Sequence, residues 1–271
     1  MAVTMMSELF MQNLSSVRIE PTAKRVRAVL DSLTVVDTNA ALLVWEPKRV
    51  VPTYAVPQRD IAATVRKAKP VSVESKFDRI PVWDPRIPFA VRQTPGHSVW
   101  IDMNGGRSVV AGFVADDPEL NGYVILDFDG FDSWLEEDDP IISHPHSPFS
   151  RIDIRSTAKH LQFVIDGVLL AETRRALILF ETGLPVRYYV PKGDVLVPLQ
   201  SSDTVTVCAY KGVATYFSPV ATESLSRDLA WSYENPLIDA ERVRNYICFF
   251  DEKLDLTIDG VARPRPTTPW S

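Results

Sequence analysis

The fold is decided by a stretch that occurs twice, as Arg25-Val-Arg-Ala-Val-Leu-Asp-Ser-Leu-Thr-Val-Val-Asp-Thr38 and as His160-Leu-Gln-Phe-Val-Ile-Asp-Gly-Val-Leu-Leu-Ala-Glu-Thr173. Each copy reads as a strand, a tight Asp-Ser or Asp-Gly turn and a second strand, which is the signature of a β-hairpin. A stretch that recurs in this way within one chain indicates a repeated structural unit. This one predicts two copies of one domain in tandem.

The similarity continues downstream of the hairpins. Residues 41–46 match residues 176–181, and after a one-residue length difference residues 54–61 match residues 188–195. Further along we align residues 98–102 with 204–208, and residues 121–128 with 245–251. Strand-like alternation and β-branched residues dominate throughout, and the best helical candidate is the short segment 238–244. We therefore expect a mainly β protein: two tandem domains of antiparallel sheets with little helix.

The expected organisation is an N-terminal arm at residues 1–16, a degenerate first repeat at 17–142 and a better-preserved second repeat at 143–271. A Pro-rich joint covers residues 136–150. The first repeat carries a Pro-rich insertion at residues 68–95, whose Trp83 and Phe89 predict a loop pinned to a surface. We expect the two repeats to pair within the chain as a pseudo-dimer, as copies of one domain do in a homodimer.

Composition excludes several classes of protein. The chain has 271 residues, 45% hydrophobic and 24% charged, with a net charge of −6. An acidic balance argues against nucleic-acid binding, and no apolar run approaches the roughly 20 residues that span a bilayer. We expect a cytoplasmic protein without a signal peptide. Two cysteines do not form a disulfide framework, and without a C-x-x-C pair no metal or cofactor is expected.

Three motifs of the second repeat carry a family resemblance: Glu181-Thr-Gly-Leu-Pro-Val-Arg-Tyr-Tyr-Val-Pro191, Cys208-Ala-Tyr-Lys-Gly-Val-Ala-Thr-Tyr216 and Trp231-Ser-Tyr-Glu-Asn-Pro236. With them, residues 152–260 resemble the bacterial and fungal family known as domain of unknown function 427. The resemblance implies a β-tent (Mss-four-like) fold, shared with the B-class methionine sulfoxide reductases and the thalidomide-binding domain of cereblon. It implies no established activity. The zinc-holding C-x-x-C pairs of several β-tent relatives are missing from this sequence.

The first repeat departs from this pattern. We align its residues 102–108 with the Cys-x-Tyr-Lys-Gly stretch and its residues 112–116 with the Trp-Ser-Tyr stretch, and the polar motif residues are missing from both. The first repeat is therefore expected to keep a packing role, while the second keeps the site.

The candidate catalytic residues are Lys211, Cys208 and Glu181. In a strand Cys208 and Lys211 face opposite ways, but a bulge at Gly212 would bring Lys211 beside Cys208 and favour its thiolate. A nucleophilic cysteine also requires a base, and no histidine is near in sequence, which favours the alternative that Cys208 is a buried small apolar residue. Lys211 is either an amine that engages an anion or a carbonyl group, or an ordinary ion-paired lysine. Glu181 is either a general base or a structural residue that caps a turn or pairs with Arg187.

The candidate ligand-binding residues form a cationic and aromatic set. Their rings suit a cage for a planar or cationic ligand, or the rim of a core. The set consists of Arg187, Tyr188, Tyr210, Lys211, Trp231 and Tyr233. Outside this set, the pair Arg174-Arg175 could recognise a carboxylate or phosphate or be a solvated surface pair. The first repeat has Asn39-Ala40 at these positions.

These observations favour a protein that binds a small organic ligand, anionic or planar, in an aromatic pocket of the second repeat, with catalysis unassigned. The alternative is an interaction or scaffold protein without a catalytic site. A deep pocket lined by Tyr188, Tyr210, Lys211 and Trp231 would favour the first. Solid packing of the same side chains, with an exposed apolar patch elsewhere, would favour the second.

Overall fold

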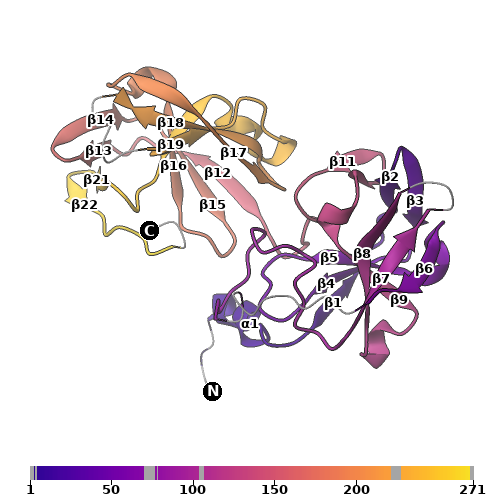
Figure 1. Ribbon diagram of the computed structural model, residues 1–271. Helices are drawn as coiled ribbons and strands as arrows, with labels where there is room; N and C mark the ends of the chain where they lie inside the picture. Colours follow the sequence, from indigo (N-terminus) through magenta and orange to yellow (C-terminus); the bar gives the residue numbers. More distant parts are fainter. Residues whose placement is uncertain are drawn as a thin grey trace. The chain divides into compact units, whose positions relative to one another are not determined.

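The computed structural model describes residues 3, 5–69, 77, 79–103, 107–220 and 227–268. The chain divides into two compact units, Met1–Ser147 and Pro148–Ser271, and the division falls inside the Pro-rich joint. In the described part of the chain each unit contains one seven-stranded and one four-stranded antiparallel sheet (Figure 1). The protein is therefore two tandem β domains with little helix, as the sequence predicts.

The first unit opens with the helix α1 (Met6–Gln12). Its seven-stranded sheet has the order β1 (Arg18–Pro21), β4 (Leu42–Trp45), β5 (Thr53–Pro57), β9 (Tyr123–Leu126), β8 (Ser108–Ala115), β7 (Gly96–Asp102) and β6 (Thr64–Lys67). Its four-stranded sheet has the order β11 (Asp139–Ile141), β10 (Ser133–Glu136), β2 (Val26–Leu30) and β3 (Leu33–Thr38). Short 3-10 helices are η1 (Gln58–Asp60), η3 (Pro118–Leu120) and η4 (Phe128–Gly130).

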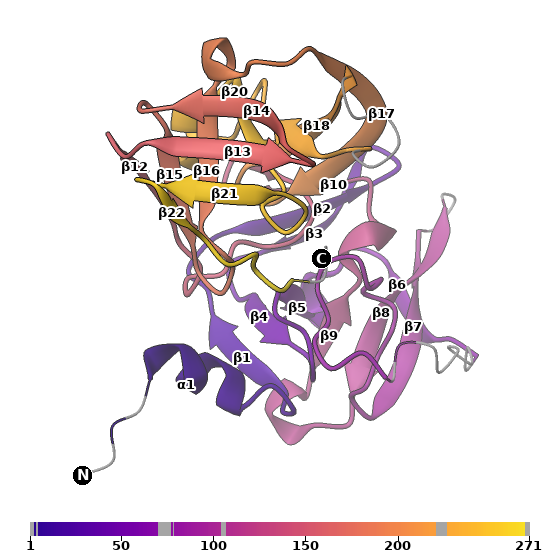
Figure 2. The same ribbon diagram turned by 90° about the vertical axis from the view of Figure 1, so that its left-hand side faces the viewer.

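The second unit repeats this arrangement. Its seven-stranded sheet has the order β12 (Ile152–Ser156), β15 (Leu177–Glu181), β16 (Arg187–Pro191), β20 (Tyr246–Phe249), β19 (Ala230–Ser232), β18 (Gly212–Pro219) and β17 (Leu199–Cys208). The four-stranded sheet, with neighbouring strands clear in Figure 2, is β14 (Val168–Thr173), β13 (Leu161–Ile165), β21 (Asp255–Ile258) and β22 (Val261–Ala262). Its 3-10 helices are η5 (Lys192–Asp194) and η7 (Ile238–Val243), the latter within the segment predicted to be helical.

The repeated hairpin is reproduced down to its irregularities. The β2–β3 ladder shifts register between Ala28 and Val29, and the β13–β14 ladder shifts between the equivalent residues Phe163 and Val164. In both strands that begin the hairpin, alternate residues are buried, because one face of the sheet packs on the core. The sequence repeat is thus a repeat of three-dimensional structure.

Strand order corrects one part of the sequence alignment. Residues 98–102 lie in β7, the second strand from its sheet edge, whereas residues 204–208 lie in the edge strand β17. The strand of the first unit at the position of β17 is β6. The counterpart of the turn that carries Lys211 is therefore the insertion 68–95, and not residues 102–108. The other alignments agree with the strand order, since β9 and β20 hold the same place.

Each unit has its own hydrophobic core. In the first unit the insertion adds a small cluster in which Trp83 is buried, and Phe89 joins the main core. The buried guanidinium of Arg49 donates to the carbonyl oxygens of Ile87 (3.0 Å), Pro88 (2.6 Å) and Val91 (2.8 Å). Apolar packing and the hydrogen bonds of Arg49 thus help to fix the described part of the insertion to the unit. No helix in the described part of the chain has the length and apolarity needed to cross a membrane.

Candidate functional site

The turn between β17 and β18 positions Lys211. Gly212 follows it with φ of +96°, where a Cβ would lie 3.3 Å from the Asn235 carbonyl oxygen. Only glycine adopts this conformation readily, and a side chain would also crowd the neighbouring backbone. The Leu237 amide donates to the Lys211 carbonyl oxygen at 3.1 Å. The backbone of Lys211 is therefore fixed from both sides, and its side chain turns inward, where the residue is 8% exposed.

The Lys211 ammonium lies between two of the predicted site residues. It forms an ion pair with Glu181 at the end of β15, and Cys208 at the end of β17 lies close enough to affect its pKa. Burial lowers the pKa of Lys211, but the charge of Glu181 and the neighbouring Cys208 raise this pKa by more, so the net shift is upward. Lys211 is consequently a cation at neutral pH, suited to donating hydrogen bonds and not to acting as a nucleophilic amine.

Two buried phenols complete this cluster. Tyr189 is 1% exposed and Tyr233 is 5% exposed, and the Trp231 indole donates to the Tyr189 hydroxyl at 3.4 Å. Burial raises the pKa of Tyr189, with Cys248 adding to the shift, and burial raises the pKa of Tyr233, with Tyr189 adding to it. Both hydroxyl groups therefore remain protonated donors. We call Glu181, Tyr189, Cys208, Lys211 and Tyr233 the polar cluster.

Arg187 belongs to a separate ionic group. Its guanidinium donates to Glu252 at 2.8 and 2.6 Å and forms an ion pair with Asp251, and it lies over the Trp231 ring at 5.4 Å. Burial lowers the pKa of Arg187, but the two carboxylates raise it by more. The ion pair that Glu181 forms is with Lys211, whereas Arg187 pairs with Asp251 and Glu252. Asp251 and Glu252 were missed because they lie more than sixty residues from Arg187 in the chain.

The remaining predicted ligand-binding residues are less enclosed. Tyr210 is half-buried in the β17–β18 turn, and Tyr188 is half-buried in β16. Successive residues of a strand face opposite ways, so Tyr188 and Tyr189 lie on opposite faces. The charges that act on Tyr188 are those of Arg263 and Asp251, whereas Tyr189 is close to Cys208 and Glu181. Alternation along β16 could have identified Tyr189, but the sequence does not say which face is the inner one.

The first unit provides an internal comparison. Glu46, at the position of Glu181, is 0% exposed and forms an ion pair with Arg92, which comes from the insertion. A cation beside this carboxylate is thus common to both units. The register of the strands places Ala55 where the second unit has Tyr189, and Ala115 where it has Tyr233. Both alanines belong to an apolar cluster of the first unit. The phenols and the thiol are therefore features of the second unit, while the ion pair is a feature of the fold.

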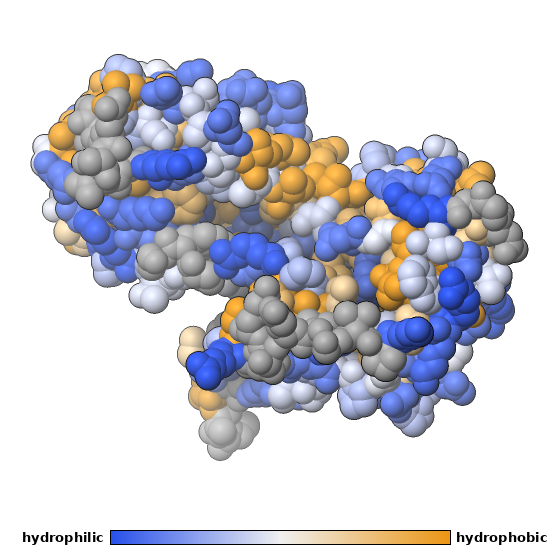
Figure 3. Space-filling view, in the orientation of Figure 1, coloured by the Kyte–Doolittle hydropathy of each residue, from blue (hydrophilic) through white to orange (hydrophobic). Residues whose placement is uncertain are grey.

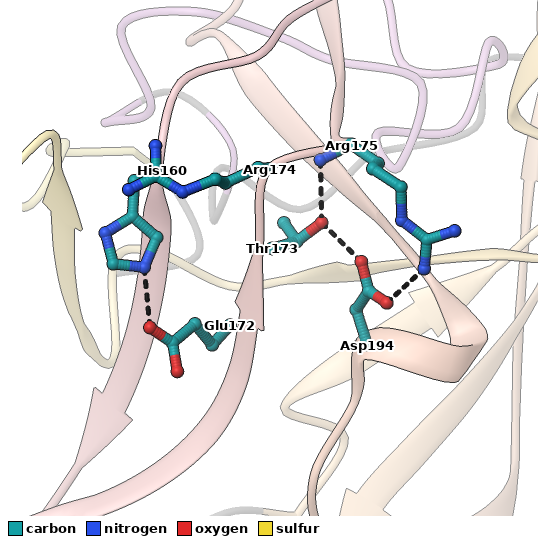
Figure 4. A pocket seen from close by; sticks show the side chains of 6 residues that line it. All are labelled: His160, Glu172, Thr173, Arg174, Arg175 and Asp194. Atoms are coloured by element: carbon teal, nitrogen blue, oxygen red, sulfur yellow. Dashed lines mark hydrogen bonds and ion pairs between the residues drawn. The ribbon is translucent and has the colours of Figure 1, made fainter.

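An open pocket of about 370 Å³ lies elsewhere in the second unit, at the end of the repeated hairpin (Figure 4). It contains the Arg174-Arg175 pair that sequence reasoning considered for anion recognition, together with His160, Glu172, Thr173 and Asp194. His160 was not predicted to take part, because it lies fourteen residues before Arg174 and reaches it through the hairpin. Among the described residues no group of three or more histidine, cysteine, aspartate or glutamate side chains is placed to hold a metal ion.

The structure is that of a tandem β protein, and the polar cluster lies in its second unit. The model of the family described as Domain of unknown function (DUF427) matches residues 153–260. The second unit is therefore similar to this family over residues 153–260. The match contains all three motifs that carry the resemblance, and the whole polar cluster lies within it. No curated protein matches the chain.

Proposed function

We propose that the second unit binds a small organic ligand at the polar cluster, through an oxygen atom that accepts a hydrogen bond from Lys211. The observation that carries this proposal is that the hydrogen-bonding capacity of the Lys211 ammonium group is only partly used. An ammonium has three donors, and among the described residues Lys211 donates to Glu181 and has Cys208 as a close neighbour. One donor is left for a ligand oxygen beside a half-buried thiol.

The nature of the surrounding groups supports the same proposal. Tyr189 and Tyr233 add neutral donors, and the ring of the half-buried Tyr210 offers flat apolar surface to a planar ligand. A polar group costs free energy when buried without a partner. The first unit builds the same fold with Ala55 and Ala115 at the phenol positions, so the phenols are not required for folding. A ligand-binding role accounts for their presence in the second unit.

The proposal assigns no reaction. A nucleophilic Cys208 requires a base that accepts its proton, and the protonated Lys211 is a donor. Glu181 is an acceptor, but its carboxylate is engaged by Lys211. Binding, with Lys211 as the donor, is the function that this arrangement favours.

The test is native mass spectrometry of gently purified protein, compared with its denatured mass. We expect a stoichiometric non-covalent extra mass in the wild type and in the control variant Lys159→Met, which alters an exposed lysine of the same unit. In Glu181→Gln the extra mass should be retained, and in the double variant Glu181→Gln/Lys211→Met it should be lost. The double variant removes both charges together, so no buried charge is left without a partner. A clean apo mass in the wild type, or an extra mass that survives the double variant, contradicts the proposal.

A second candidate function, self-association, rests on the edge strand β17. This strand has ten residues and contains no lysine or proline, the residues that commonly protect sheet edges. Val205 and Val207 on β17 and Val213 on β18 are 57%, 49% and 46% exposed, and Figure 3 shows hydrophobic side chains at this edge of the second unit. The fitting occupant is β17 of a second copy, which would pair antiparallel about a two-fold axis.

Light scattering across a concentration series tests this candidate. A wild-type dimer that becomes a monomer in Val207→Lys, but not in Val261→Lys, is the expected result; Val261 is also exposed but lies on β22. A wild type that is monomeric throughout, or two variants that behave alike, excludes pairing through β17.

A further inference from the structure

We propose that the pocket at the end of the β13–β14 hairpin binds an oxyanion, the phosphate or carboxylate group of a small ligand, with Arg174 as its main donor. This site is distinct from the polar cluster, and the proposal does not depend on the function proposed above. It rests on the pairing of the charges in the pocket and on a comparison with the same place in the first unit.

The two carboxylates of the pocket are already engaged. His160 Nε2 lies 2.6 Å from Glu172 Oε1, and the Thr173 hydroxyl donates to Asp194 at 2.6 Å. Arg175 forms an ion pair with Asp194, and its backbone amide donates to the Thr173 hydroxyl at 3.0 Å. Figure 4 shows these contacts as two separate groups, His160 with Glu172 and Arg175 with Thr173 and Asp194. Both carboxylates therefore already accept hydrogen bonds from other residues of the pocket, and neither pairs with Arg174.

Arg174 is the remaining cation of the pocket. Its side chain extends toward the His160 end of the pocket, away from Arg175 (Figure 4). The residue is exposed, and among the residues that the structure describes it has no hydrogen-bond or ion-pair partner. A guanidinium presents donors in a planar fork that matches two oxygen atoms of a carboxylate or phosphate. A pocket with one such fork and occupied carboxylates is suited to an anion.

The first unit has the same hydrogen-bonded threonine and aspartate at this place, which we call the polar frame, but it lacks the two arginines. The Thr38 hydroxyl donates to Asp60 at 2.6 Å, and the Ala40 amide donates to the Thr38 hydroxyl at 3.0 Å, which repeats the Thr173 and Asp194 geometry. Arg25 pairs with Asp37 where the second unit has His160 with Glu172. The positions of Arg174 and Arg175 are held by Asn39 and Ala40.

Because both frames form, the fold does not require the two arginines. In the first unit Arg25 pairs with Asp37 and Arg59 lies 3.7 Å from Asp60. In the second unit Arg175 pairs with Asp194 and His160 with Glu172, which leaves Arg174 as an additional cation. Hydrogen bonds from Arg175 and Thr173 lower the pKa of Asp194, which keeps Asp194 ionised and Arg175 in place. The second unit thus has the same Thr–Asp contact as the first, with an exposed arginine fork, Arg174, directed into the pocket beside it.

The test is an NMR titration of the full chain with inorganic phosphate and, separately, with acetate, at an ionic strength held constant with sodium chloride. We expect saturable shifts of the amide signals of His160, Arg174 and Arg175 in the wild type. Arg174→Asn introduces the residue of the first unit and should weaken the binding about tenfold, which corresponds to about 1.4 kcal/mol. Arg155→Asn, in an exposed arginine of β12, is the matched control and should bind as the wild type does.

The two arms of the titration distinguish the sources of the oxyanion. Saturation by phosphate identifies a phosphate-bearing ligand, and saturation by acetate identifies a carboxylate. The double variant Asn39→Arg/Ala40→Arg should gain phosphate-dependent shifts at the first unit, since the frame there is already formed. Shifts that never saturate with either anion, or that are the same in wild type and Arg174→Asn, overturn the proposal.

Discussion

Arg187 carries a positive charge into the interior of the second unit, where it is 9% exposed and held by Asp251 and Glu252. Removing one member of such a group leaves the others charged and buried without a partner. We expect Arg187→Met to lower the free energy of unfolding of this unit by about 3–5 kcal/mol. Urea denaturation measures the change. The control Arg155→Met, an exposed arginine paired with Asp153, should change it by less than about 0.5 kcal/mol. Equal effects of the two variants would show that the buried group is not stabilising.

The buried phenols make a prediction for alkaline pH. Burial raises the pKa of Tyr54, Tyr189 and Tyr233 above the usual value of 10.0. Above pH 10.0 the unfolded chain releases these protons while the folded chain retains them, so stability is unaffected below this pH and falls as the pH rises further. The phenolate absorbance of these residues should therefore appear in one step with the loss of the circular dichroism of the fold. Tyr54→Phe, Tyr189→Phe or Tyr233→Phe should each reduce that step, and a step that precedes unfolding would contradict the assignment.

At the scale of elements, the two repeated hairpins differ at the second residue of the turn. Ser32 has φ of +64°, whereas Gly167 at the same place has φ of +80°. A residue with a Cβ in this conformation costs about 1–2 kcal/mol. We expect Ser32→Gly to raise the melting temperature of the first unit and Gly167→Ser to lower that of the second. The control Ser98→Gly lies inside β7 of the first unit. It should lower the melting temperature of this unit, because glycine weakens a strand interior. A Ser32→Gly variant that also melts earlier would contradict the strain argument.

The secondary-structure elements were the part of the structure that the sequence predicted best. The hairpins, the second pair of matching strands and the mainly β class follow from local signals: turn residues, alternation and β-branched residues. Strand order does not, because it depends on contacts between distant segments. The alignment of β7 with β17 was wrong for this reason: both strands alternate in the same way, and only their places in the sheet distinguish them.

The candidate site was predicted only in part, because contacts between segments that are distant in the sequence also determine which of its residues meet. Glu181 and Lys211 were found as motif residues, but their pairing across thirty residues depends on the fold. Tyr189 was passed over for Tyr188, since alternation separates the two faces without saying which is buried. The pocket around Arg174 needed His160 and Asp194, which only the folded hairpin and η5 bring to it.

At the scale of the whole molecule, each unit has its own core and its own pair of sheets. We expect two transitions in differential scanning calorimetry. Ser32→Gly should shift only one of them and Arg187→Met only the other. A single transition that both variants shift together would mean that the units unfold as one body. The pairing of the two units as a pseudo-dimer stays a prediction, and solution scattering is the measurement that checks it.

Each unit has a glutamate at the same position, and the cations that pair with these two glutamates bear on the ancestry of the units. Glu46 and Glu181 hold the same place, yet the cation beside Glu46 is Arg92 from the insertion, and the cation beside Glu181 is Lys211 from a short turn. If both units descend from one duplicated gene with a lysine in that turn, a first copy without either cation would have carried a buried, unpaired charge. Such a copy is destabilised by several kcal/mol, which few domains survive. The insertion with its arginine therefore had to be acquired before the turn lysine was lost, which fixes the order of two events in the divergence of the copies.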